Sequence, residues 1–277
     1  MQTNKKNCLI LLGSVMLGHF SCNKEPSHMF SSSNHTNTAT SNTGAAIDRS
    51  PIPLHLALTD ELINQVQHQE TREALQRLRV TRTDINDPRL GGGHGTILHQ
   101  VVREGNAEIL GALIQAGADV NGLDSYGYTP TFVAAEHGHD SVLSVLAEAG
   151  ADINIPNQHG DTPVHIAAQC GHEVVIRGLH TLGANLNATN NEGRAPACIA
   201  TEKGHEAVIR ALHELGADLN IADNNGYTLA HVAVGRGHVH VLGVLHEAGV
   251  DLGRQNNCHE TPAWRAAADG QLHILEA

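Results

Sequence analysis

The chain has 277 residues, of which 40% are hydrophobic, and its formal net charge is −12 when the 21 histidines are neutral. This length and hydrophobic content suit a soluble protein of one or two domains with a substantial core. The negative charge disfavours a nucleic-acid partner, because the sequence has no basic stripe that would displace counterions from a phosphate backbone.

The first 22 residues have the layout of a secretory signal peptide. Lys5 and Lys6 precede an apolar run that ends at Leu17 and is too short for an ordinary membrane-spanning helix. The end of this segment resembles a bacterial lipoprotein processing site with Cys22 as the lipidated first mature residue, although His19 stands where that family has an aliphatic residue. We therefore expect an exported protein, at the cell envelope or secreted, whose attachment to a membrane is only through this lipid.

Residues 23–50 are rich in Ser, Thr and Asn and poor in large apolar residues, which predicts a disordered tether. Residues 51–91 contain "PLHLA" and "TDIN", which echo segments of the sequence that follows them. We interpret 51–91 as a degenerate unit, with extra residues in its helices, that caps the N-terminal end of a repeat array.

From residue 92 onward the sequence repeats every 33 residues. Threonine keeps this step at Thr96, Thr129, Thr162, Thr228 and Thr261, with Ala195 in the remaining position. Glycine keeps it in two columns, at Gly105, Gly138, Gly171, Gly204, Gly237 and Gly270, and at Gly117, Gly150, Gly183, Gly216 and Gly249. Three columns in one register predict a repeat protein.

The segment "GDTPVHIAAQCGH" at 160–172 predicts the first helix of one unit. Thr162 is a favourable N-cap, Pro163 stands where a helix tolerates proline best, and Gly171 ends the helix in the left-handed conformation. A second helix is expected from Glu173 until Gly183.

Neither helix is long enough to bury its apolar face alone, so the units must stack. The side chains expected to form the continuous core are two columns: Val142, Val175, Val208 and Val241, and Leu113, Leu146, Leu179, Leu212 and Leu245.

The segments "DTPVHIAA", "GHEVV" and "LGANLN" resemble the ankyrin repeat. The resemblance covers residues 92–277 as five complete units and a sixth that stops in its second helix, so either the sixth is a short cap or the chain is truncated. It implies an all-α ankyrin-repeat solenoid, in which helix-turn-helix units are joined by β-hairpin-like turns.

The histidines also fall into columns. His165 shares its column with His99 and His231, and since Phe132 fills the same position in another unit, a catalytic or ligand role is implausible. The resemblance implies that these histidines are structural, and so are the four at a second recurring position: His139, His172, His205 and His238.

His180, His213 and His246 form a third column, where ankyrin repeats usually have an aliphatic residue. Stacked helices lie about 10 Å apart, which is too far for neighbouring histidines to share a zinc ion with Zn–N bonds of about 2.1 Å. Two interpretations stay open: a solvated stripe, and a stripe whose protonation makes docking sensitive to pH.

The sequence contains no phosphate-binding loop, no H-E-x-x-H and no G-x-S-x-G motif. Cys170 has no neighbouring cationic pair that would activate a thiolate. We therefore expect no enzymatic activity, no cofactor and no metal.

The resemblance implies a protein-binding module that holds its partner through the turn tips and the concave face of the first helices. Carried over by position, the tip residues are Tyr126, Tyr128, His159, Asp161, Glu192, Arg194, Asn225 and Tyr227. The helix residues are Glu136, His137, Gln169, Cys170, Glu202, Lys203 and Arg236. We expect a monomer whose tyrosines anchor a polar interface of moderate affinity.

An alternative is that the array is the regulatory or targeting part of a larger enzyme, or of a secreted bacterial effector, whose catalytic region lies outside this sequence. The effector reading places the protein in the cytoplasm of a host cell.

Overall fold

The computed structural model describes residues 51–81, 84–91 and 95–271. The leader expected at 1–22, its lipidation site Cys22 and the tether expected at 23–50 lie outside the described residues. The chain divides into two compact units, Met1–Pro51 and Ile52–Ala277, and all the elements below belong to the second.

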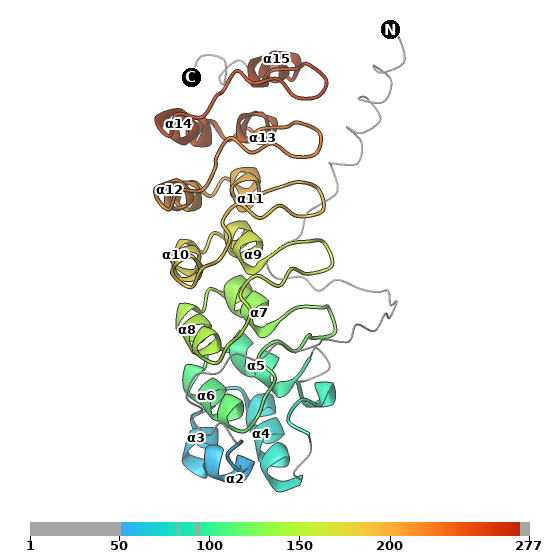
Figure 1. Cartoon of the computed structure of the whole chain (residues 1–277), viewed down its shortest axis with the longest axis vertical. Helices are drawn as coiled ribbons and strands as arrows, with labels where there is room; N and C mark the ends of the chain where they lie inside the picture. Colours follow the sequence, from blue (N-terminus) through green and yellow to red (C-terminus); the bar gives the residue numbers. More distant parts are fainter. Residues whose placement is uncertain (1–50, 82–83, 92–94, 272–277) are drawn as a thin grey trace, which may run out of the picture. The chain divides into compact units, whose positions relative to one another are not determined.

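The helices of this unit form two layers (Figure 1). The first layer contains α5 (Ile97–Arg103), α7 (Pro130–His137), α9 (Pro163–Cys170), α11 (Pro196–Lys203), α13 (Leu229–Arg236) and α15 (Pro262–Ala268). The second layer contains α6 (Ala107–Gln115), α8 (Asp140–Glu148), α10 (Glu173–Thr181), α12 (Glu206–Glu214) and α14 (Val239–Glu247). Each first-layer helix and the second-layer helix that follows it form one unit, so α5 and α6 are unit 1 and α13 and α14 are unit 5. The last helix, α15, belongs to unit 6. Each helix packs on the equivalent helix of the next unit, as the all-α solenoid prediction requires.

The helix ends follow the predicted capping pattern. In unit 2 the hydroxyl of Thr129 accepts a hydrogen bond from the Phe132 amide at 3.2 Å. In unit 3 Thr162 and His165 form a reciprocal capping box, in which the Thr162 amide donates to Nδ1 of His165 at 3.1 Å. Gly171 ends this helix with a φ of 78°, in the region that glycine adopts without strain.

The loops between units are tight turns closed by their own backbone. In the turn before α11, the Asn190 amide donates to the Arg194 carbonyl at 3.0 Å. The Asn190 side chain accepts from the amides of Glu192 and Arg194, both at 3.0 Å, which holds the tip in one conformation. The turn before α13 adds an isolated antiparallel bridge between Ala222 and Thr228, so these are the expected β-hairpin-like turns.

The core is the pair of predicted columns. All four valines and all five leucines named above are at most 1% exposed, and they belong to one continuous cluster that runs from Leu58 to Val250. The small side chains Ala167 and Ala168 on α9 are fully buried, which lets neighbouring first helices approach closely.

Histidines make hydrogen bonds across the joints between units. Nε2 of His165 lies 3.0 Å from the Arg194 carbonyl oxygen in unit 4. Because a carbonyl only accepts, Nε2 carries the proton, which leaves Nδ1 as the acceptor for Thr162. His99 and His231 make the equivalent bonds to the carbonyls of Tyr128 and Glu260. The structural role predicted for this column is confirmed.

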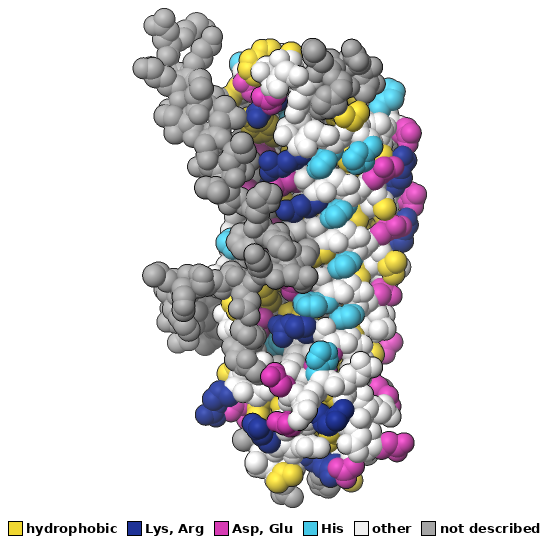
Figure 2. Space-filling model, turned by 180° about the vertical axis from the view of Figure 1, so that it is seen from behind, with side chains coloured by type: hydrophobic (Ala, Val, Ile, Leu, Met, Phe, Trp, Pro, Cys, Tyr) yellow, Lys and Arg dark blue, Asp and Glu magenta, His cyan; other side chains and the backbone are white. Residues whose placement is uncertain are grey.

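The second histidine column bonds in the opposite direction, each histidine reaching the preceding unit. Nε2 of His172 donates to the Glu136 carbonyl of the preceding unit at 3.0 Å, and its ring packs on Gly138, where an added Cβ would lie 3.1 Å away. The other members make the same contact: His139, His205 and His238. Figure 2 shows histidine side chains that follow one another along one face of the array. The hydrogen bonds of His139, His172, His205 and His238 show that this column is also structural.

The unit before α5 contains α2 (Leu54–Ala57), α3 (Asp60–Asn64), α4 (Gln69–Thr81) and the 3₁₀ helix η1 (Pro88–Gly91). Here α4 lies beside α5, and α2 and α3 lie beside α6, so the two layers follow in the reverse order along the chain (Figure 1).

The end of this unit nevertheless joins the array in the regular way. Asn86 accepts from the Asp119 amide at 2.8 Å, as Asn121 does from Asp152. Asn106 stands where the second column has histidine in later units, and a polar hollow of about 420 Å³ lies beside it.

We predict that His165→Phe, which places the unit 2 residue at this position, lowers the free energy of unfolding at pH 7.5 by about 1–3 kcal/mol. The variant leaves the Arg194 carbonyl and the Thr162 amide without their partner. Burial lowers the pKa of His165 below its ordinary value of 6.5, so the stability from the neutral ring is full above pH 6.5 and is lost as pH falls through the folded-state pKa. Urea denaturation at several pH values should show the two proteins converging in acid. His180→Phe, at an exposed position of α10, is the control. Equal losses in both variants would contradict the prediction.

Candidate functional site

The residues expected to bind a partner all lie on one surface, which we term the tip-and-helix surface. The eight tip residues lie in the turns before α7, α9, α11 and α13, and the seven helix residues lie in the last turns of α7, α9, α11 and α13. His137, His159, Glu192, Asn225 and Arg236 are exposed, and the other ten are partly buried. The fold brings them together in a row because each unit repeats the same geometry.

The tip tyrosines are held by ring contacts. Tyr128 stacks on Phe132 with ring centroids 4.5 Å apart and planes at 12°, and Tyr126 lies 6.1 Å from Tyr128. Tyr227 meets the buried ring of His231 edge-on at 5.6 Å. These ring contacts limit the freedom of the tyrosine side chains before a partner binds, which lowers the entropy lost on binding.

Glu202 lies at the centre of an ion network that joins units 4 and 5. Its carboxylate pairs with Arg194 at 2.9 Å and with Arg236 at 2.6 Å, and Arg194 also pairs with Glu192 at 2.8 Å. The Glu202 side chain is only 16% exposed, so each arginine offsets part of the cost of its burial.

Glu136 lies at the same position in unit 2, with different surroundings. Its side chain is 29% exposed, and the ion-pair partner found among the described residues is Nδ1 of His137 at 3.8 Å. That nitrogen donates to the Val133 carbonyl at 3.0 Å, and burial lowers the pKa of His137, so His137 supplies no full charge at neutral pH. Burial raises the pKa of Glu136, and the charge of Arg103 opposes the rise without forming an ion pair in the described structure.

Two further residues of this region were not predicted from the sequence. Asp124 is 8% exposed, and its Oδ2 has no hydrogen-bond partner in the described part of the chain, so burial raises its pKa. Arg103 is the unit 1 counterpart of Glu136, 33 positions earlier, and the repeat frame contained the signal that would have identified it.

Unit 3 offers polar side chains with fewer charges. Oδ1 of Asp161 accepts a hydrogen bond from the side-chain nitrogen Nδ2 of Asn190 at 2.8 Å, so one carboxylate oxygen already has a partner. Gln169 and Cys170 are partly buried at the end of α9. The described residues contain no cluster of three or more His, Cys, Asp or Glu side chains that could hold a metal.

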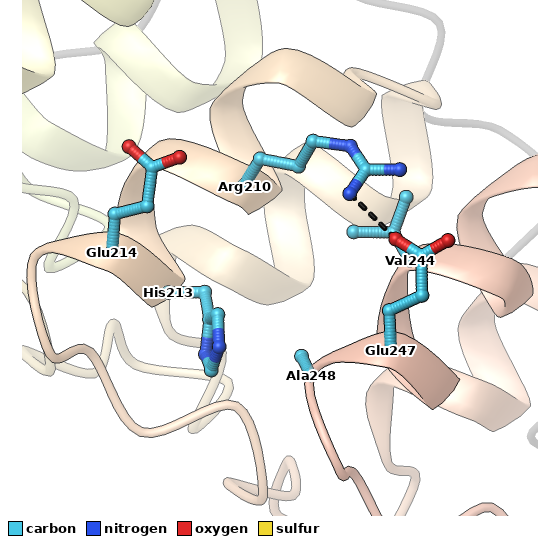
Figure 3. A pocket seen from close by; sticks show the side chains of 6 residues that line it. All are labelled: Arg210, His213, Glu214, Val244, Glu247 and Ala248. Atoms are coloured by element: carbon cyan, nitrogen blue, oxygen red, sulfur yellow. Dashed lines mark hydrogen bonds and ion pairs between the residues drawn. The ribbon is translucent and has the colours of Figure 1, made fainter.

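The second-layer helices carry ion pairs between units. Arg177 bridges Glu173 and Glu214, and Arg210 bridges Glu206 and Glu247. A hollow of about 200 Å³ lies between α12 and α14, and Figure 3 shows the Arg210–Glu247 pair spanning it. Because these charged groups already pair with each other, we interpret the hollow as part of the joint.

The third histidine column, His180, His213 and His246, is exposed on this second layer, as expected for a surface stripe. That protonation of this column makes docking sensitive to pH stays a prediction.

A protein-family model described as "Ankyrin repeats (3 copies)" matches residues 54–157 and 151–223, which together make up more than half of the chain. No curated protein matches the sequence. Among the described residues, none of the helices has the length and apolar character needed to cross a membrane.

We predict that Glu136→Gln raises the urea midpoint of unfolding at pH 7. Burial raises the pKa of Glu136 in the folded protein, so folding favours the protonated carboxyl. This contribution to stability is complete below the unfolded-state pKa and is lost as pH rises through the folded-state pKa. The increase in urea midpoint caused by Glu136→Gln should therefore disappear in acid, where the wild-type carboxyl is also neutral. The control is Glu148→Gln on the exposed outer side of the same unit, which should change the midpoint little. A lower midpoint for Glu136→Gln at pH 7 would refute the argument.

Proposed function

The chain belongs to the ankyrin-repeat family, whose arrays are protein–protein interaction modules, and from this premise we propose that it binds a protein partner through its tip-and-helix surface. The observation that carries the proposal is the arrangement of the tip tyrosines. All three tyrosines of the chain are partly exposed on this surface, and each ring contacts an aromatic neighbour.

The charges of this surface support a polar interface. Units 2 and 3 present Glu136 and Asp161, whereas units 4 and 5 present Arg194, Lys203 and Arg236 together with Glu202. A partner that lies along the row therefore meets a negative region at one end and a region of mixed sign at the other. Such patterns give specificity and orientation more than raw affinity.

We predict that changing Tyr126, Tyr128 and Tyr227 together to alanine reduces recovery of the bound partner by about tenfold or more in affinity capture, because buried aromatic anchors dominate interface energies. The measurement compares captured proteins by quantitative mass spectrometry, with circular dichroism to establish that the variant is folded.

The matched control is a triple alanine variant of the second layer at Val174, His180 and His213, which are all exposed. It should recover the same partners as the wild type. If the tyrosine variant recovers every partner equally, the proposed surface is wrong.

We also propose that the protein is exported and lipidated on Cys22, on the basis of the leader sequence alone. Intact-mass measurement of the protein expressed with its own leader in bacteria should then show a mature chain that begins at Cys22 and carries acyl groups. Cys22→Ser should prevent the lipid addition. A retained Met1 would contradict export through this leader and would favour the effector reading.

A further inference from the structure

The array contains a filled example of a site that is repeated elsewhere with different residues. In units 4 and 5, Glu202 accepts ion pairs from Arg194 in the tip of its own unit and from Arg236 in the following first helix. We term this arrangement the Glu202 site. The two arginines approach the carboxylate from different elements, one on each oxygen, so the geometry holds two guanidinium groups at once.

The equivalent position two units earlier, which we term the Glu136 site, lacks both cations. The 33-residue frame places Tyr128 where the Glu202 site has Arg194, and Cys170 where it has Arg236. The backbone is the same in both, since α7 and α11 both end at an αL glycine and His172 and His238 bond the carbonyls of Glu136 and Glu202 alike. The site therefore keeps the carboxylate and loses its internal partners.

The surroundings of the Glu136 site are negative. Burial raises the pKa of the Tyr128 phenol, and the carboxylates of Glu136, Asp124 and Asp161 raise it further, which places all three near this ring. Arg103 is the cation that acts on Glu136, and it forms no ion pair with Glu136 in the described structure. From Ile97 to Asn157, Arg103 is the sole Arg or Lys, against eight Asp and Glu residues.

Resting on the function proposed above, we propose that the Glu136 site receives an arginine side chain of the partner protein, which pairs with the Glu136 carboxylate beside the ring of Tyr128. The guanidinium takes the place that Arg194 or Arg236 occupies at the Glu202 site. Three features favour arginine: the guanidinium–carboxylate pairing already used twice at Glu202, the partly exposed aromatic ring beside the carboxylate, and a Glu136 carboxylate that has no arginine or lysine ion-pair partner in the described structure.

Binding at this site also removes a cost that the free protein bears. Glu136 and Asp124 are largely withdrawn from water without full compensation, and Oδ2 of Asp124 has no partner in the described structure. A cation brought to this site lowers the electrostatic free energy of both carboxylates, which makes the attraction stronger than that of an exposed surface carboxylate.

The test uses the full chain and four pools of fluorescein-labelled heptapeptides, whose central residue is arginine, lysine, citrulline or glutamate and whose other positions are varied uncharged residues. Citrulline has nearly the shape of arginine and no charge. Fluorescence anisotropy should show that the arginine pool binds the wild type about tenfold more tightly than the citrulline pool, as expected for one charge-assisted pair.

Three variants locate the effect. Glu136→Gln should abolish the preference for arginine over citrulline, and Tyr128→Arg, which copies Arg194 and fills the site internally, should do the same. Glu148→Gln removes one carboxylate from the outer helix of the same unit and should keep the preference. Circular dichroism establishes that each variant is folded.

The proposal is overturned if no pool binds, if the wild type binds arginine and citrulline equally, or if Glu136→Gln keeps the preference. It is also overturned if Glu148→Gln and Glu136→Gln weaken binding equally, since that result describes only general attraction by an acidic protein. These outcomes leave the tip-and-helix surface itself standing if the tyrosine variant still loses its captured partner, so failure of the site and failure of the proposed function are distinguishable.

Discussion

The structure depends on hydrogen bonds that each unit can complete only with its neighbours. The carbonyl at the end of one first helix, as at Glu136, accepts from a histidine of the next unit, and the carbonyl of a tip, as at Arg194, accepts from a histidine of the unit before. A lone unit would leave these carbonyls to water and its apolar face uncovered. Stacking buries the apolar face, and the histidines then supply the hydrogen bonds that the covered carbonyls need. Stability therefore depends mainly on the contacts between neighbouring units.

This dependence separates the residues that build the array from those that are available for recognition. The first two histidine columns, the capping threonines, and the valine and leucine columns form the joints and the core. The tip residues and the last turns of the first helices repeat the same backbone with side chains that differ from unit to unit. A row of rigid positions with variable chemistry is suited to reading a partner, because the scaffold orders those side chains in advance.

The 33-residue repeat also shows which partly buried carboxylates have arginine partners within the array and which do not. Glu202 has two arginine partners, whereas Glu136 has tyrosine and cysteine at the equivalent positions. An internal comparison of this kind is possible only in a repeat protein, since two sites with one backbone geometry differ in nothing but their side chains. The difference points to a partner's cation more directly than the net charge of the chain does.

The sequence by itself determined the period, the helix ends at Thr162 and Gly171 and the core columns, because the residues that cap and stack the helices recur along the array at a fixed step. The family resemblance added the structural role of His165. Only the tertiary structure decided that α4 rather than α2 lies beside α5, although "PLHLA" echoes a first helix. It also decided that Arg236 pairs with Glu202 and that Glu136 is largely buried without a strong partner. Those outcomes depend on which helices face each other and on what covers a side chain, and neither is encoded in local propensity.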